Sequence, residues 1–148
     1  MNSLTLDVLL ASVHHLFVFS LVAVLFAELV LAGGVPDAAR LRQLGRLDSA
    51  YGLLAMGIVA AGFLRAVYGA KGWAFYAHNP VFWTKIGVFI VVGLLSIVPT
   101  VRLVRWRKAG VIPDAGAMRS TRQWMLAQVA LVALIPVIAV LMARGVGY

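Results

Sequence analysis

The sequence predicts an all-α fold, a polytopic membrane protein built as an up-and-down bundle of four transmembrane helices. Hydrophobic residues make up 63% of the 148 residues and charged residues only 12%, far from the balance of an ordinary soluble domain. Four apolar stretches are long enough to cross a bilayer, for which about 20 residues suffice at 1.5 Å each. Because the four spans leave little other sequence, residues 1–148 are expected to form one domain.

The first span is expected to stay in the mature protein. It lacks a basic segment before it, is too long for a signal peptide, and carries His14 and His15 inside its apolar stretch. Gly33 and Gly34 are expected to end it, and Asp48 to cap the second span. The four predicted spans cover residues 6–31, 49–68, 81–101 and 124–143.

Further helix boundaries follow from glycine, asparagine and proline. Gly69 and Gly72 close the second span, and Asn79 with Pro80 matches an N-cap followed by the first helical residue. Pro99 and Pro136 are expected to bend the third and fourth spans. Aromatic residues between the second and third spans are interpreted as an interfacial anchoring belt: Trp73, Phe75, Tyr76, Phe82 and Trp83. Small residues on the second span allow close packing or a planar ligand, packing being the commoner use: Gly52, Gly57, Gly62, Ala66 and Gly69, with Met56 beside them.

The basic residues predict the topology of the chain. The net charge is +8, and nine Lys and Arg residues lie in the first and third connections against one, Lys71, in the second. The positive-inside rule then places both connections in the cytoplasm and both termini outside. This distribution accounts for the charge without a nucleic-acid partner. Because cysteine is absent, disulfides, thiolate metal sites and iron–sulfur clusters are excluded.

Ionisable residues inside the spans are the candidates for function, since each costs roughly 2.5–3.5 kcal/mol to insert and is kept where it is paired or useful. Four residues spaced seven apart share one face of the first helix: Asp7, His14, Leu21 and Glu28. His15 lies about 100° further round the helix. The stripe therefore favours His14 over His15 as the residue that faces the bundle.

Depth predicts two polar clusters. His14, Lys85 and Arg65 lie about 12, 7.5 and 6 Å below the outer ends of their spans at 1.5 Å per residue, so all three fall in the outer half. A second, acidic group lies near the cytoplasmic side: Glu28, Asp48, Tyr51 and Gln128.

The outer group has the components of a haem b site. His14 or His15 offers an imidazole nitrogen for the iron, and Arg65 and Lys85 offer cations for the propionates. A neutral Lys85 amine is also a candidate for the second axial ligand or for acid–base catalysis. Competing interpretations are a helix-pairing hydrogen bond for His14 and snorkelling towards the headgroups for Arg65 and Lys85.

Other chemistries have less support from the same residues. A zinc or copper site would need more ligands than two adjacent histidines that diverge on a helix. No nucleophile, base and orienting acid occur in a hydrolase arrangement. A proton or solute path through Glu28, His14 and Lys85 remains open, although so small a bundle would have to oligomerise to transport a solute.

Four segments, residues 13–31, 46–57, 79–100 and 133–145, together resemble an uncharacterised family of predicted four-helix bacterial membrane proteins. This resemblance implies a bacterial inner (cytoplasmic) membrane, with both termini periplasmic. More remotely, the histidines of the first span and the Trp83/Lys85 pair resemble those of HemJ-type protoporphyrinogen oxidases, and the bundle is similar to CopD-type copper-resistance domains. The HemJ resemblance implies haem b, bound by His14 or His15, and an oxidoreductase in which Lys85 assists.

The sequence therefore predicts an inner-membrane protein with haem b between its helices and a redox or haem-handling role. Two alternatives stay open. One is a non-enzymatic structural or accessory subunit of a membrane complex, and the other is a small ion, metal or solute carrier. The expected partners are the lipid bilayer and a further copy or a larger membrane complex.

Overall fold

The protein is an all-α bundle with four helical spans. The computed structural model describes residues 3–147. Four stretches of this part are long and apolar enough to cross a membrane, and they contain 28 to 31 residues each. The predicted fold class is therefore confirmed. The helices are α1 (Ser3–Leu31), α2 (Ala38–Tyr68), α3 (Gly72–Ala77), α4 (Pro80–Ala109), α5 (Ala115–Val132) and α6 (Leu134–Ala143), with α5 and α6 together forming the fourth span.

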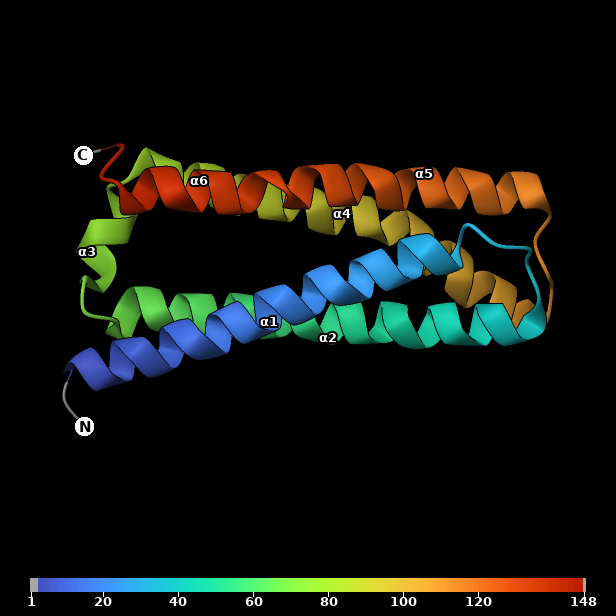
Figure 1. The fold of residues 1–148 in the computed structure, drawn as a ribbon, viewed down its shortest axis with the longest axis horizontal. Coiled ribbons are helices and arrows are strands. Elements are labelled where there is room, and N and C mark those ends of the chain that lie inside the picture. The colour runs from blue at the N-terminus through green and yellow to red at the C-terminus, as the bar shows by residue number, and fades with distance from the viewer. Residues whose placement is uncertain (1–2, 148) are drawn as a thin grey trace.

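Both ends of the described chain lie at the same end of the bundle, beside the short helix α3 (Figure 1). The α1–α2 and α4–α5 connections lie at the opposite end. This arrangement is the predicted up-and-down topology. We call the end with α3 the outer end and the end with the two connections the inner end, following the orientation predicted from the basic residues.

The helices extend beyond the predicted spans on the inner side, and this corrects the role of Asp48. Helix α2 begins at Ala38, and its N-cap is Asp37, whose carboxylate accepts from the backbone N–H of Arg40 at 2.7 Å. Asp48 therefore lies one-third of the way along α2 instead of capping it. The apolar stretch of the sequence located the membrane-spanning segment of α2. The helix begins earlier and includes the polar residues before that segment.

The boundaries of α4 follow the sequence signals. The side-chain oxygen of Asn79 accepts from the N–H of Val81 at 2.8 Å and of Phe82 at 3.3 Å, and Pro80 is the first helical residue. At the other end Gly110 takes a left-handed conformation, with φ +64°, which glycine adopts without steric cost.

The two intramembrane prolines differ in effect. Helix α4 runs without interruption past Pro99, which is buried. In the fourth span the helix stops at Val132 and resumes at Leu134. Val132 lies four residues before Pro136, where the proline ring clashes with the helical carbonyl. The fourth span is therefore interrupted before Pro136, and the predicted bends at Pro99 and Pro136 stay predictions.

The helices are arranged in a ring, and within residues 3–147 α1 packs against only two other helices. Helix α1 packs along α2 and against α5, and within residues 3–147 none of its Cα atoms comes within 8 Å of α4 or α6. Towards the outer end α1 diverges from α6 (Figure 1). Buried apolar clusters fill the inner end around Leu44 and Leu103, the middle around Leu21 and Leu25, and the outer end around Phe82.

Candidate polar sites within the spans

The polar stripe of α1 faces α2. Leu21 and Glu28 are 2% and 3% exposed, and Asp7 forms an ion pair with Arg65 of α2. His14 lies against Gly62 of the same helix. The interval of seven residues therefore correctly identified the buried face of α1.

Glycines of α2 make room for these side chains. A Cβ atom at Gly62 would lie 3.2 Å from Cε1 of His14, and one at Gly57 would lie 3.2 Å from the ring of Phe17. At Gly69 a Cβ atom would lie 2.5 Å from Oδ1 of Asp7. These three positions on α2 are thus occupied by α1 side chains, and the small residues serve helix packing.

The two histidines of α1 have different surroundings. His15 is exposed, its Nδ1–H donates to the carbonyl oxygen of Ala11 at 2.6 Å, and its ring lies 6.4 Å from that of Phe19. His14 is partly buried, and its Nδ1 is a buried atom without a hydrogen-bond partner. His14 is therefore the histidine with an unused nitrogen inside the bundle.

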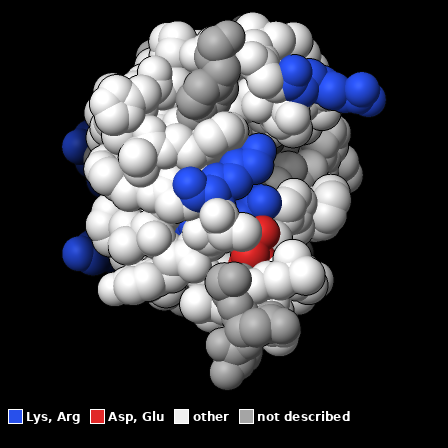
Figure 2. Space-filling model, turned by 90° about the vertical axis from the view of Figure 1, so that its left-hand side faces the viewer, with Lys and Arg blue, Asp and Glu red and all other residues white. Residues whose placement is uncertain are grey.

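We define the outer polar cluster as Asp7, His14, Arg65 and Lys85, which come from α1, α2 and α4. Oδ1 of Asp7 lies 3.8 Å from Nε of Arg65, with side chains 25% and 32% exposed. The charges of Lys85 and Arg65 both act on the His14 ring and on each other. Nζ of Lys85 also lies 5.4 Å from the centre of the Phe82 ring. Figure 2 shows this end of the molecule, where a basic surface near the middle borders a small acidic surface.

We define the inner polar cluster as Glu28, Asp48, Tyr51, Thr100 and Gln128. The hydroxyl of Thr100 donates to Oδ1 of Asp48 at 2.6 Å and joins α4 to α2. Glu28 is 3% exposed and its Oε1 has no hydrogen-bond partner, while it interacts electrostatically with Asp48 and Tyr51. Gln128 is 2% exposed, and its amide donates to the Trp124 carbonyl at 3.5 Å. Thr100 could not be identified from the sequence, because a threonine in a helix gives no signal of its own. Its partner Asp48 was interpreted as a helix cap.

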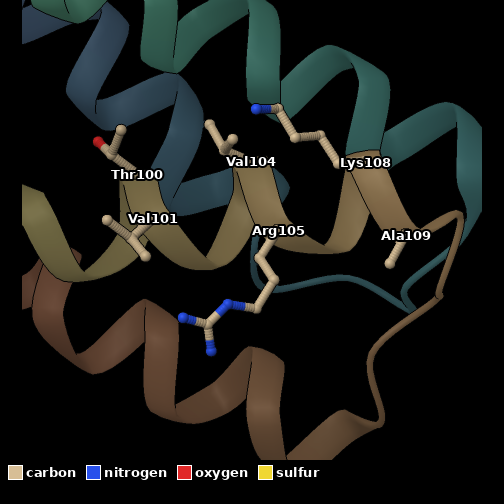
Figure 3. Close-up of a pocket in the computed structure, with 6 residues that line it drawn as sticks. All are labelled: Thr100, Val101, Val104, Arg105, Lys108 and Ala109. Atoms are coloured by element: carbon tan, nitrogen blue, oxygen red, sulfur yellow. The ribbon is translucent and has the colours of Figure 1, made fainter.

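Two hollows border α4. The first, of about 550 Å³, lies along α4 from Thr100 to Ala109, and Figure 3 shows Arg105 and Lys108 projecting to opposite sides of this helix. The second, of about 470 Å³, is a groove between α2 and α4 that passes the inner polar cluster at Asp48, Tyr51 and Thr100. Neither hollow is lined by His14, His15 or Lys85.

A haem b site requires a ligand for the iron and cations for the propionates. Within residues 3–147 no group of three or more His, Cys, Asp or Glu side chains is placed to hold a bare metal ion. Haem needs fewer protein ligands, because its porphyrin supplies four. His14 offers an imidazole for the iron, and Arg65 and Lys85, whose charges act on it, offer cations for the propionates, so the residue types of the cluster suit haem. His15 lies on the exposed surface of α1, directed away from the bundle, and its Nδ1–H is bonded to the Ala11 carbonyl so that only Nε2 could take iron.

Several basic residues have structural partners that sequence reasoning missed. Arg122 donates from Nε to the carbonyl of Leu29 at 3.2 Å, and Arg40 donates to the carbonyl of Leu31 at 3.3 Å. Both carbonyls lie in the last turn of α1, where helical partners run out; the Leu31 carbonyl also accepts from the N–H of Gly34 at 3.4 Å. A basic residue shortly after the end of α1 is a signal that could have identified Arg40, whereas Arg122 lies on α5 and gives no such signal.

Comparison with known proteins identifies the family. No curated protein and no solved structure matches the chain. The resemblance to HemJ-type oxidases and CopD-type domains has no support from these comparisons and stays a prediction. A family model described as "Predicted membrane protein (DUF2214)" matches residues 6–147, which include all four spans. The chain therefore belongs to the DUF2214 family of predicted membrane proteins.

Proposed function

We propose that the outer polar cluster is the functional site and that it holds haem b for a redox or haem-handling role. The observation that carries this proposal is the partly buried imidazole of His14 on the bundle side of α1, acted on by the charges of Lys85 and Arg65.

The charge balance of the cluster favours an anionic ligand. Asp7 neutralises Arg65, which leaves the charge of Lys85 without a carboxylate partner among the described residues. An uncompensated charge in a membrane span is costly, and an anionic group beside it lowers that cost. A haem propionate supplies such a group, and arginine and lysine are common partners of carboxylates.

Each residue of the cluster then has a distinct task. His14 ligates the iron, Arg65 and Lys85 hold the propionates, and Asp7 keeps the Arg65 side chain in place. Bound haem would supply one-electron chemistry in the membrane. If the protein is an enzyme, it is an oxidoreductase, and Lys85 would be the residue that transfers a proton.

The orientation of the protein belongs to the same proposal. Basic residues concentrate at the inner end, so this end faces the cytoplasm of a bacterial inner membrane and the termini face the periplasm. The outer polar cluster would then lie in the periplasmic half of the bilayer. A further copy of the chain, or a larger complex, remains the expected partner.

A specific observation also favours a second candidate, a purely structural role. His14, Phe17 and Asp7 fill the spaces above three glycines of α2, as expected for a device that pairs two helices. In that case the protein is a non-enzymatic scaffold or accessory subunit, and the cluster only fixes the register of α1 on α2.

Titration with haem and with its dimethyl ester separates these two candidates. The purified apoprotein in mild detergent should bind haem with a saturable Soret shift, and the ester, which lacks the carboxylates, should bind at least about tenfold more weakly. Arg65→Gln and Lys85→Gln should weaken binding of haem but not of the ester. A folded protein with no saturable shift, or equal affinities for both compounds, would assign the cluster to helix pairing.

A further inference from the structure

We propose that the hollow along α4 from Thr100 to Ala109 binds one anionic phospholipid, whose phosphate is held by Arg105 and Lys108. We call this hollow the α4 hollow. It lies at the inner end of the bundle, so the proposal does not rest on haem binding at the outer polar cluster.

The two basic side chains that line the α4 hollow lack an acidic partner in the protein. Arg105 and Lys108 are both exposed. Within residues 3–147 the single ion pair within 4 Å joins Asp7 to Arg65, at the other end of the molecule. Two positive charges therefore border one hollow without a carboxylate beside them. An anion in this hollow is attracted by both charges.

The direction of these side chains brings their charges to the hollow. Both side chains turn back along α4 towards Thr100, one on each side of the helix (Figure 3). Their charged groups thereby reach the level of Val101 and Val104, instead of extending past the end of the helix. Side chains of an α-helix generally lean in this direction, towards the N-terminus. The two cations and the apolar surface between them thus face the same ligand.

The α4 hollow lies where α4 leaves the membrane. The predicted apolar span ends at Val101, and Arg105 is four residues further on, about 6 Å at 1.5 Å per residue. The headgroup layer on each side of a bilayer is about 5–8 Å thick, and lipid phosphates lie within it. Trp106, which is partly buried beside Arg105, is of a residue type enriched in this layer. The cations of the hollow are therefore at the depth of lipid phosphates.

The remaining lining favours an amphiphile over a soluble anion. Val101 and Val104 are 46% and 38% exposed, and Ala109 is exposed as well. This apolar wall gains nothing from inorganic phosphate, but it packs against the glycerol backbone and the first methylenes of a lipid. The volume of about 550 Å³ lies within the range of about 300–1,000 Å³ for small-molecule sites, and the acyl chains continue into the bilayer.

The charges select among lipids. A guanidinium group donates two parallel hydrogen bonds to phosphate oxygens, and a lysine ammonium adds a point charge. Basic pockets at the ends of transmembrane helices bind anionic headgroups in this way. A zwitterionic headgroup carries its own cation, which Arg105 and Lys108 repel. The hollow is therefore expected to prefer an anionic phospholipid.

Two double variants separate this site from a general attraction of lipid to the basic inner end. Arg105→Gln with Lys108→Gln removes both cations of the α4 hollow. Arg42→Gln with Arg119→Gln removes the same charge from exposed positions outside the lining.

A pair of apolar variants tests the shape of the hollow with all charges retained. Val104→Trp fills the α4 hollow. Val91→Trp adds the same bulk at another exposed position of α4, outside the lining. Because both positions are exposed, both variants should fold, which circular dichroism verifies.

The experiment counts bound lipid on the full chain in nonionic detergent by native mass spectrometry. The probes are dioleoyl phosphatidylglycerol, its zwitterionic counterpart dioleoyl phosphatidylcholine, and glycerol 3-phosphate, which has no acyl chains. We expect one phosphatidylglycerol per chain, at least about tenfold weaker binding of phosphatidylcholine, and no saturable binding of glycerol 3-phosphate at the same concentrations.

The variants should change the affinity for phosphatidylglycerol selectively. The Arg105/Lys108 double variant should weaken it by about 25-fold, since each basic residue near an anionic headgroup contributes about fivefold. The Arg42/Arg119 double variant should change it by less than about twofold. Val104→Trp should weaken it by at least about fivefold, and Val91→Trp should leave it unchanged.

Four results would overturn the proposal. Equal affinities for the two lipids would remove the selection by charge, and equal losses in the two double variants would show only a general attraction to the inner end. Glycerol 3-phosphate that binds as tightly as the lipid would make the ligand a soluble anion. A wild-type dimer that excludes lipid and dissociates with Val104→Trp would show that a second copy covers the hollow. Haem binding is measured separately and can hold or fail in each case.

Discussion

Cε1 of His14 on α1 lies where it would be 3.2 Å from a Cβ atom at Gly62 on α2. The absence of a side chain at Gly62 therefore determines how closely the imidazole approaches α2. This contact links the packing of the first two spans to the residue on which the proposed function depends.

Enlarging Gly62 should destabilise the bundle and move His14. We expect Gly62→Leu to lower the free energy of unfolding by about 1–3 kcal/mol, the usual cost of overpacking. Gly87→Leu is the control, since a Cβ atom there meets nothing within 4 Å. Unfolding in mixed detergent, followed by circular dichroism, measures both variants. Equal stability of the two proteins would contradict the close contact.

The ion pair between Asp7 and Arg65 should contribute little to stability. The side chains are 25% and 32% exposed, and the 3.8 Å between Nε and Oδ1 is too long for a hydrogen bond, so the interaction is weak. A double-mutant cycle with Asp7→Asn and Arg65→Gln should give a coupling free energy of about 0.2–1 kcal/mol. A coupling of several kcal/mol would mean that this end of the bundle is sealed from water.

The hydrogen bond from Thr100 to Asp48 should stabilise the contact between α4 and α2. We expect Thr100→Val to lower the free energy of unfolding by about 1 kcal/mol, which lies within the range for hydrogen bonds between membrane helices. Thr84→Val is the matched control, because the Thr84 hydroxyl donates to the Pro80 carbonyl of its own helix at 2.9 Å. An equal loss of unfolding free energy in both variants would contradict a stabilising role for the hydrogen bond between Thr100 and Asp48.

Arg122 should contribute to the free energy of unfolding, and Arg119 should not. Arg122 satisfies the Leu29 carbonyl near the end of α1, whereas Arg119 is exposed on the same helix, α5. Arg122→Ala is expected to cost about 1–2 kcal/mol of unfolding free energy, and Arg119→Ala less than about 0.5 kcal/mol. Thermal unfolding of the two variants in one detergent distinguishes a structural arginine from one that only sets topology.

The sequence predicted the parts of the structure that depend on periodicity and on local backbone chemistry. The heptad interval placed Asp7, His14 and Glu28 on the face towards α2, and Asn79 with Pro80 marked the start of α4. Both signals are local to one helix. They do not require knowledge of which helices are neighbours.

Contacts between helices could not be predicted from signals within single helices. Asp48 has the sequence context of a cap, but its partner is Thr100, which is 52 residues further along the chain. Arg122 reaches a carbonyl 93 residues away. The short helix α3 was also missed, because its six residues are too few for a periodic pattern.

The most direct test of the central claim is the haem content of the protein as purified after expression with ample haem supply. We expect about one haem per chain in the wild type and in His15→Ala, and almost none in a folded His14→Ala protein. A wild type without haem, or equal haem content in the two histidine variants, would contradict the assignment of His14 as the iron ligand.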